Sequence, residues 1–283
     1  MNNTKHQHVV PQFHLRYFSE NNTLAAVRIS DGYEFKTSVY DACGWDWIYD
    51  DDPQATDSLE NILRKDEKDM SVFMNNIVKN DVNVANADDL IKYVCLLSSR
   101  SLDIIESVQH MMSNGIIDSN TKNAIKQYYL NRRHLLNGNN RSLFDAFILK
   151  SNSTIDFITA DVPYYLQDVR GSENEDRLSI GNDYFNSDYV AWFCPISLKQ
   201  CIVITRKTII GGKIQSLIKD NNNDELIRSI NMNMAYYATE FIYSKKTPIN
   251  AYRDSKELDT HSLKLEYLDN IMKIRKNHKL SHS

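Results

Sequence analysis

The chain has 283 residues, 42% of them hydrophobic and 25% charged, which is enough apolar material for one substantial core. The formal net charge of −4 excludes a general attraction to nucleic acid or to an anionic membrane. No apolar run approaches the roughly 20 residues of a membrane-spanning helix, and the opening MNNTKHQHVV lacks the apolar stretch of a signal peptide. We therefore expect a cytoplasmic protein with a single compact domain, residues 1–283.

The first region, residues 1–50, is predicted to be extended. Two apolar runs, Thr23 to Ile29 and Gly32 to Tyr40, flank a Ser-Asp-Gly turn, which is typical of a β-hairpin.

A helical layer is predicted over residues 57–151. From Asp57 to Ile77 the apolar residues recur with a helical period, and Asp57 with Glu60 fits a capping box. A second, more apolar helix is expected over residues 86–112, and the segments 119–137 and 141–150 continue the helical pattern.

The pattern becomes extended again over residues 154–206, where a polar loop separates two apolar stretches. C-terminal helices are expected over residues 208–277, including one from Asn222 to Ser244 and an amphipathic one from Ser255 to Lys276. The predicted fold class is therefore α+β, predominantly helical, with two small antiparallel β regions, near the N-terminus and around residues 154–206.

The four cysteines are predicted to be free thiols, because none lies in a CxxC pair and no export signal precedes them. Cys194 and Cys201 are placed so that they could face one another across a pair of strands. A thiolate zinc site is not expected.

The stretch HVVPQFHLRYF resembles the N-terminal signature of a bacterial and phage family known as domain of unknown function 4238. The matching residues are His8, Pro11, Gln12, Leu15, Arg16 and Phe18. Similar blocks follow in the same order as far as Ser244: SVYDACGWDWIY, LENILRKDE, Arg100 in LSSRSL, ITADVPYY, FCPISLKQCIVI and NMNMAYYATEFIYS. The sequence ADVP departs from the family's Ser-Asp-Asn-Pro block. The resemblance implies a fold but no established chemistry.

The polar residues inside these blocks allow two interpretations. They are His8, Arg16, Glu60, Glu67, Arg100 and Asp161. In the interpretation that we favour, His8, Arg16, Glu60, Glu67 and Arg100 form an ion-pair and hydrogen-bond network that holds the N-terminal segment against the helices, because a buried charge needs a partner. In the alternative, His8 acts as acid or base, and Glu60, Glu67 and Asp161 hold a divalent metal beside Arg100.

Two surface features are candidates for binding a partner. Trp45, Trp47 and Tyr49 form an aromatic group next to acidic residues, and this charge favours core packing or a protein contact over nucleic acid. Arg132 and Arg133 lie in a basic stretch that fits either an exposed helix end or a phosphate contact.

Two functions are carried forward from the sequence. The first is a non-enzymatic, homo-oligomeric protein-binding factor of phage–bacterium conflict, without cofactor or metal, whose partner is a bacterial defence complex. It rests on the absence of catalytic motifs and on an analogy of size with phage anti-defence proteins such as the Gabija inhibitors. The second is a metal-dependent hydrolase or nuclease, and only this alternative requires a divalent ion.

Overall fold

A computed structural model of the chain describes residues 6–46, 48–49, 59–79, 86–101, 105, 110, 114, 124–127, 129–130, 142–168, 189–220 and 222–256. Within these residues helices combine with antiparallel sheets, so the predicted α+β class is confirmed, although sheets hold more of the core than the predicted emphasis on helices implies.

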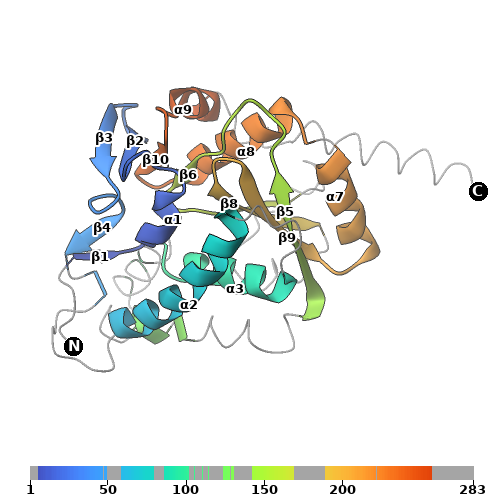
Figure 1. Cartoon of the computed structure of the whole chain (residues 1–283), viewed down its shortest axis with the longest axis horizontal. Coiled ribbons are helices and arrows are strands. Elements are labelled where there is room, and N and C mark those ends of the chain that lie inside the picture. Colours follow the sequence, from blue (N-terminus) through green and yellow to red (C-terminus); the bar gives the residue numbers. More distant parts are fainter. Residues whose placement is uncertain are drawn as a thin grey trace, which may run out of the picture.

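The N-terminal region builds a two-stranded and a four-stranded sheet (Figure 1). The first sheet pairs β1 (His6–His8) with β4 (Gly44–Asp46). The second has the order β3-β2-β10-β6, with bounds β2 (Thr23–Arg28), β3 (Glu34–Ser38), β6 (Thr159–Ala160) and β10 (Phe241–Ser244). The predicted hairpin is confirmed as β2 and β3, which pair in antiparallel register. Residues 1–50 are not extended throughout, because a short helix, α1 (Gln12–Arg16), begins directly after Pro11.

A third sheet forms the centre of the molecule and is antiparallel throughout, in the order β5-β9-β8-β7. Its strands are β5 (Phe144–Lys150), β7 (Tyr165–Asp168), β8 (Val190–Ser197) and β9 (Gln200–Arg206). The predicted β region around residues 154–206 is therefore confirmed, but the sheet also recruits β5 from the segment predicted to be helical.

Five of the helices surround these sheets. They are α2 (Leu59–Lys79), α3 (Ala87–Ser98), α7 (Ile209–Asp220), α8 (Asp224–Tyr237) and α9 (Ile249–Lys256). In the view of Figure 1, α2 and α3 lie below the central sheet and α8 and α9 lie above it. Side chains cap two of the helices, because Asn86 accepts from the Asp88 amide and Asn223 from the Leu226 amide, each at 3.0 Å.

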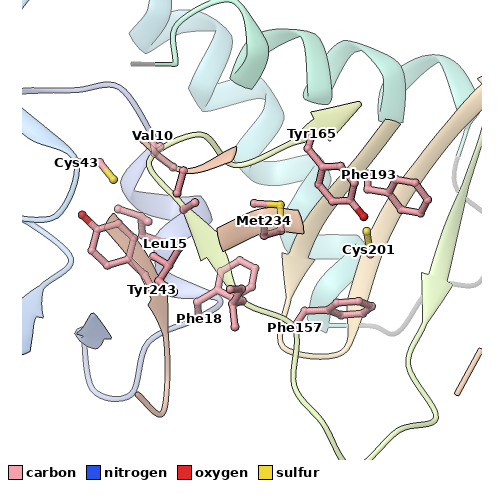
Figure 2. Packing of buried hydrophobic residues seen from close by; sticks show 14 of the residues in the cluster. Val10, Leu15, Phe18, Cys43, Phe157, Tyr165, Phe193, Cys201, Met234 and Tyr243 are labelled. Carbon is pink, nitrogen blue, oxygen red and sulfur yellow. The ribbon is translucent and has the colours of Figure 1, made fainter. Parts of the chain in front are cut away.

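The central sheet is covered on both faces, which explains why its strands read as continuous apolar runs. Successive side chains of β8 alternate between the faces. Ala191 and Phe193 pack in the core that contains the apolar residues of α7 and α8, whereas Trp192 and Cys194 pack in the core that contains α3. Figure 2 shows part of the first core, where Tyr165, Phe193 and Cys201 gather on one side and Val10, Leu15 and Phe18 on the other.

The four cysteines are all buried free thiols, as predicted. Cys194 and Cys201 do not face one another, because Cys194 pairs with Ile202 across the strands and the two sulfur-bearing side chains point to opposite faces of the sheet.

Two segments predicted to be helical are strands. Phe144–Lys150 is β5, which pairs with β9 along its full length. Phe241–Ser244 is β10, because α8 ends at Tyr237 and the chain is extended at Ala238.

Other expectations fall on residues outside the described ranges: the cap at Asp57, most of the second predicted helix beyond residue 101, most of the segment 119–137, the polar loop beyond residue 168, and the helix from Ser255 to Lys276 beyond residue 256. None of the helices in the described part of the chain has the length and apolar character needed to cross a membrane.

Candidate functional site

The N-terminal strand directs its residues to two sides. Gln7 is fully buried, and its side-chain oxygen accepts a hydrogen bond from the Tyr49 amide at 2.7 Å. His6 and His8 lie on the opposite side of the strand, as the spacing of two residues predicts. The alternation thus anchors the strand with Gln7 and presents two imidazoles to the outside.

The carbonyl oxygen of Tyr40 orients both histidine rings. The Nε2 atom of His6 lies 3.0 Å from it and that of His8 lies 2.8 Å from it. Since a carbonyl only accepts, each ring carries its proton on Nε2 to make these bonds, which leaves the Nδ1 atom of a neutral His8 as an acceptor. The Tyr40 ring also stacks on His6, with 4.9 Å between centroids.

Burial lowers the pKa of His8 below its ordinary value. The hydrogen bond to Tyr40 acts in the opposite direction, but the nearby charges of His6 and Arg100 add to the lowering. His8 is therefore neutral at pH 7 and able to accept a proton.

Close contact between Gly44 and His6 fixes the position of the His6 ring. A Cβ atom at Gly44 would lie only 2.3 Å from Nε2 of His6. Gly44→Ala is therefore expected to displace the ring, break its bond to Tyr40 and lower the free energy of unfolding by about 1–2 kcal/mol. Chemical denaturation and the NMR signals of the His6 ring measure both effects.

The matched control for this change is Gly212→Ala, because nothing lies within 4 Å of a Cβ atom at that helical position. It is expected to stabilise the protein slightly, as alanine does in an exposed helix. Equal effects of the two substitutions would contradict the packing of His6 on Gly44.

Arg100 ties the N-terminal strand to α2. Its side chain is 2% exposed, and its guanidinium group donates to the Glu67 carboxylate and to the His8 carbonyl oxygen. The guanidinium also lies over the Tyr49 ring, 5.6 Å from its centroid. Burial opposes the charge of Arg100, but Glu67 and Tyr49 outweigh it, so the pKa of the guanidinium is raised. These contacts join Arg100 to Glu67 and to the backbone of the N-terminal strand, whereas the His8 side chain bonds to the Tyr40 carbonyl instead.

The position of Arg100 in the chain differs from the prediction. The second predicted helix does not run through it, because α3 ends at Ser98 and a turn follows. The hydroxyl of Ser99 donates to the Cys95 carbonyl at 2.6 Å, and such a bond competes with the helical pattern. The turn therefore brings the guanidinium to the end of α3, where it reaches both α2 and β1.

Arg16 and Glu60 complete the predicted network only in part. Arg16 is exposed and donates to the side-chain oxygen of Gln12 at 3.0 Å. Within the described part of the chain no acidic side chain contacts Arg16, so the hydrogen bond to Gln12 is its observed link to the network. The carboxylate of Glu60 lies 3.8 Å from the guanidinium group of Arg64, one turn along α2.

These side chains share one open cleft of about 500 Å³, bounded by the N-terminal segment and α2. Its lining consists of His6, His8, Gln12, Phe13, Arg16, Glu60, Arg64, Glu67, Lys68, Ser71 and Arg100. The cleft therefore brings together five of the six polar residues that the sequence blocks single out.

The resemblance that these sequence blocks indicate is confirmed by comparison with known families. The sequence matches the family described as "Protein of unknown function (DUF4238)" over residues 6–137 and 138–248. The chain belongs to this family. No curated protein and no solved structure matches it significantly. The cleft is thus built from residues that lie far apart in the DUF4238 match, such as His8 and Arg100, which are 92 positions apart.

Asp161, the sixth residue, lies apart from the cleft in this DUF4238 protein. It is fully buried, and its carboxylate accepts hydrogen bonds from the amides of Thr239, Glu240 and Phe241 at 3.0, 2.5 and 2.9 Å. Burial raises its pKa to about 6, although the three amides act to lower it. Asp161 shapes the turn before β10 and does not meet His8, Glu60 or Glu67.

Metal binding and partner contacts receive little support from the described residues. In the ranges that the structure covers, no group of three or more histidine, cysteine, aspartate or glutamate side chains is arranged to hold a metal ion. Among the aromatic candidates, Tyr49 is buried and therefore not a surface anchor, and Trp45 is half-buried against the core. Trp47, Arg132 and Arg133 lie outside the described residues.

Sequence reasoning missed part of the cleft. Arg64, Lys68 and Ser71 follow Glu60 at intervals of three to four residues, so they share a face of α2 with it. This spacing is a signal that could have identified them from the position of Glu60 alone.

Proposed function

We propose that the chain is a binding protein for a small polar molecule and that the cleft between the N-terminal segment and α2 is its binding site. The observation that carries this proposal is the convergence of His8, Arg16, Glu60, Glu67 and Arg100 on one open cleft, although they come from three separate parts of the chain. The volume of about 500 Å³ falls in the range of pockets that hold small organic ligands.

The side chains of the cleft are already held in fixed positions by the protein, which supports a binding role. Tyr40 orients His6 and His8, and Glu67 orients Arg100, before any ligand arrives. Groups that are held in place lose little conformational entropy on binding. The neutral His8 offers an acceptor nitrogen, and the arginines offer donors, so a ligand with both donor and acceptor groups fits this lining.

A metal-dependent hydrolase is a second candidate, because His8, Glu60 and Glu67 do line the same cleft. The pairing of Glu67 with Arg100 weakens this candidate, since a guanidinium already occupies the carboxylate that the metal would need. The protein-binding factor of phage–bacterium conflict remains a prediction from the sequence.

Ser71→Trp tests the proposed function by filling the cleft with an indole ring while leaving its charged groups in place. We expect at least a tenfold loss of affinity for small polar ligands, because the ring occupies their volume. A library of polar fragments, screened against the unaltered protein by ligand-observed NMR with and without Mg²⁺ or Mn²⁺, supplies the ligands.

The matched control is Val72→Trp, which adds the same ring at the next position of α2, where the side chain is exposed and does not line the cleft. It should leave the affinities unchanged. Fragments that bind both tryptophan variants equally, or a library without any binder, would refute the proposal. Metal-dependent cleavage of a fragment by the unaltered protein and by Val72→Trp, but not by Ser71→Trp, would replace it with the hydrolase.

A further inference from the structure

The charged residues of the cleft divide into two pairs and two remaining cations. Glu60 lies beside Arg64, and Glu67 is paired with Arg100. Arg16 and Lys68 line the same cleft, and neither contacts an acidic side chain in the described ranges. The four arginine and lysine side chains of the described lining outnumber its two glutamates, which leaves an excess of two positive charges without counting the histidines.

This local excess contrasts with the formal net charge of the whole chain, which is −4. Two positive charges around an open cleft of this size match a small dianion. A phosphate monoester carries close to two negative charges at neutral pH, whereas a single carboxylate carries one.

A second observation comes from Arg100 at the wall of the cleft. Its two terminal nitrogens are bound by Glu67 and by the His8 carbonyl, but its Nε atom is buried without an acceptor anywhere in the described part of the chain. A buried N–H group without a partner is costly. Because this atom is closed off from solvent, the cations that a ligand in the cleft meets directly are the exposed Arg16 and Lys68.

The remaining lining indicates that the phosphate is part of a larger molecule. Phe13 contributes an aromatic surface to the cleft, and the volume of about 500 Å³ exceeds that of a phosphate group alone. An organic group attached to the phosphate would rest on Phe13 while the phosphate faces the cations.

We infer that the cleft selects a small phosphate monoester, with Arg16 and Lys68 as the phosphate-binding cations and Phe13 as the contact for the organic group. This inference rests on the proposed function, because it names the class of ligand for the same site. Arginine and lysine both bind phosphate, arginine through a planar fork and lysine as a point charge.

The test measures the affinity of phenyl phosphate by titration calorimetry at pH 7.5 and low salt, beside inorganic phosphate and benzoate. We expect phenyl phosphate to bind more tightly than either of the other two. Arg16→Gln and Lys68→Gln should each weaken it roughly tenfold or more, as the loss of a charge-assisted hydrogen bond does. Both side chains are exposed, so both variants should keep the melting temperature of the unaltered protein.

Lys65→Gln is the matched control, because Lys65 is an exposed lysine of α2 that does not line the cleft. Equal weakening by Lys65→Gln and Lys68→Gln would overturn the inference, as would benzoate binding as tightly as phenyl phosphate. Tighter binding of inorganic phosphate than of the ester would refute the role of Phe13. Failure of all three probes, while polar fragments still bind in a manner blocked by Ser71→Trp, would overturn this inference and leave the proposed function standing.

Discussion

Arg100→Met is expected to lower the free energy of unfolding by about 3 kcal/mol, the largest effect that we expect from a single change in the network. Methionine has a similar length but no charge, so Glu67 loses its counter-ion and the carbonyl of His8 loses its donor. Removing one partner of a buried ion pair costs about 3–5 kcal/mol, and the 28% exposure of the Glu67 side chain places this case at the lower end. Urea denaturation at pH 7 measures the change.

The control for this prediction is Arg28→Met, because Arg28 forms an exposed ion pair with Asp31 on the N-terminal hairpin. Exposed pairs contribute little, so only a small change is expected. The double variant Arg100→Met with Glu67→Met removes both charges and should be more stable than Arg100→Met alone. If the double variant were less stable by the full sum of the two single changes, the two residues would not be coupled.

This network shows that the N-terminal histidine segment can hold the fold together and line the cleft at the same time. Docking of the strand and exposure of the cleft are two results of one arrangement, since Arg100 holds the backbone of His8 while the His8 ring remains at the cleft. The structural and functional interpretations of these residues are therefore compatible. A stability measurement alone does not separate them, whereas the affinity of a ligand at Lys68, which is outside the network, does.

Much of the fold follows from local patterns. The β2–β3 hairpin has a turn sequence between apolar runs, and α2 has a helical stripe that runs over the predicted residues. Both elements are specified by neighbours in the sequence, which is why the period of the apolar residues is sufficient to predict them.

The strand β5 shows where such patterns fail. Leu143, Phe144, Phe147 and Ile148 have the three- and four-residue spacing of a helix. The segment is a strand because β9 pairs with it over seven residues, and because its two faces enter different cores, Ala146 with α3 and Leu149 with α7 and α8. A strand covered on both sides loses the alternation that would identify it.

The prediction of a helix where β10 lies is wrong for a different reason. The apolar spacing of α8 continues into Phe241, but the buried carboxylate of Asp161 accepts the amides of Thr239, Glu240 and Phe241. Those amides would otherwise bond within a longer helix. An acceptor some 80 residues earlier in the chain thus ends the helix, and no local pattern reveals it.

The sequence predicts which residues line the candidate site better than it predicts the role of each. Family blocks single out His8, Arg16, Glu60, Glu67 and Arg100, and all five line the cleft. The same reasoning placed Asp161 with them, because residues in a block can serve the fold as well as a site. Only the distances between side chains separate these two roles.

Acid is expected to destabilise the protein through His14, whose ring is fully buried between the Tyr93 hydroxyl at 2.6 Å and the Thr159 hydroxyl at 3.0 Å. Burial lowers its pKa from 6.5 to about 3. The folded protein therefore binds fewer protons than the unfolded chain between these two values, so stability is lost as the pH falls through this window. The contribution of His14 amounts to a loss of about 2 kcal/mol between pH 7 and pH 5.

The measurement compares urea denaturation at pH 7 and pH 5 in the unaltered protein and in His14→Phe, which fills the same space with a ring that does not titrate. The comparison between proteins is needed because Asp161 acts in the opposite direction: its pKa is raised to about 6, so its protonation favours the folded state over part of the same window. That contribution is common to both proteins and cancels in the difference.

His14→Phe should start from a lower stability than the unaltered protein, because two buried hydroxyl groups lose their partner. On acidification it should nevertheless lose about 2 kcal/mol less. Tyr93→Phe removes one hydrogen bond but keeps the imidazole, so it should retain the pH dependence of the unaltered protein. Equal slopes in His14→Phe and Tyr93→Phe would show that His14 is not the group whose protonation unfolds the chain.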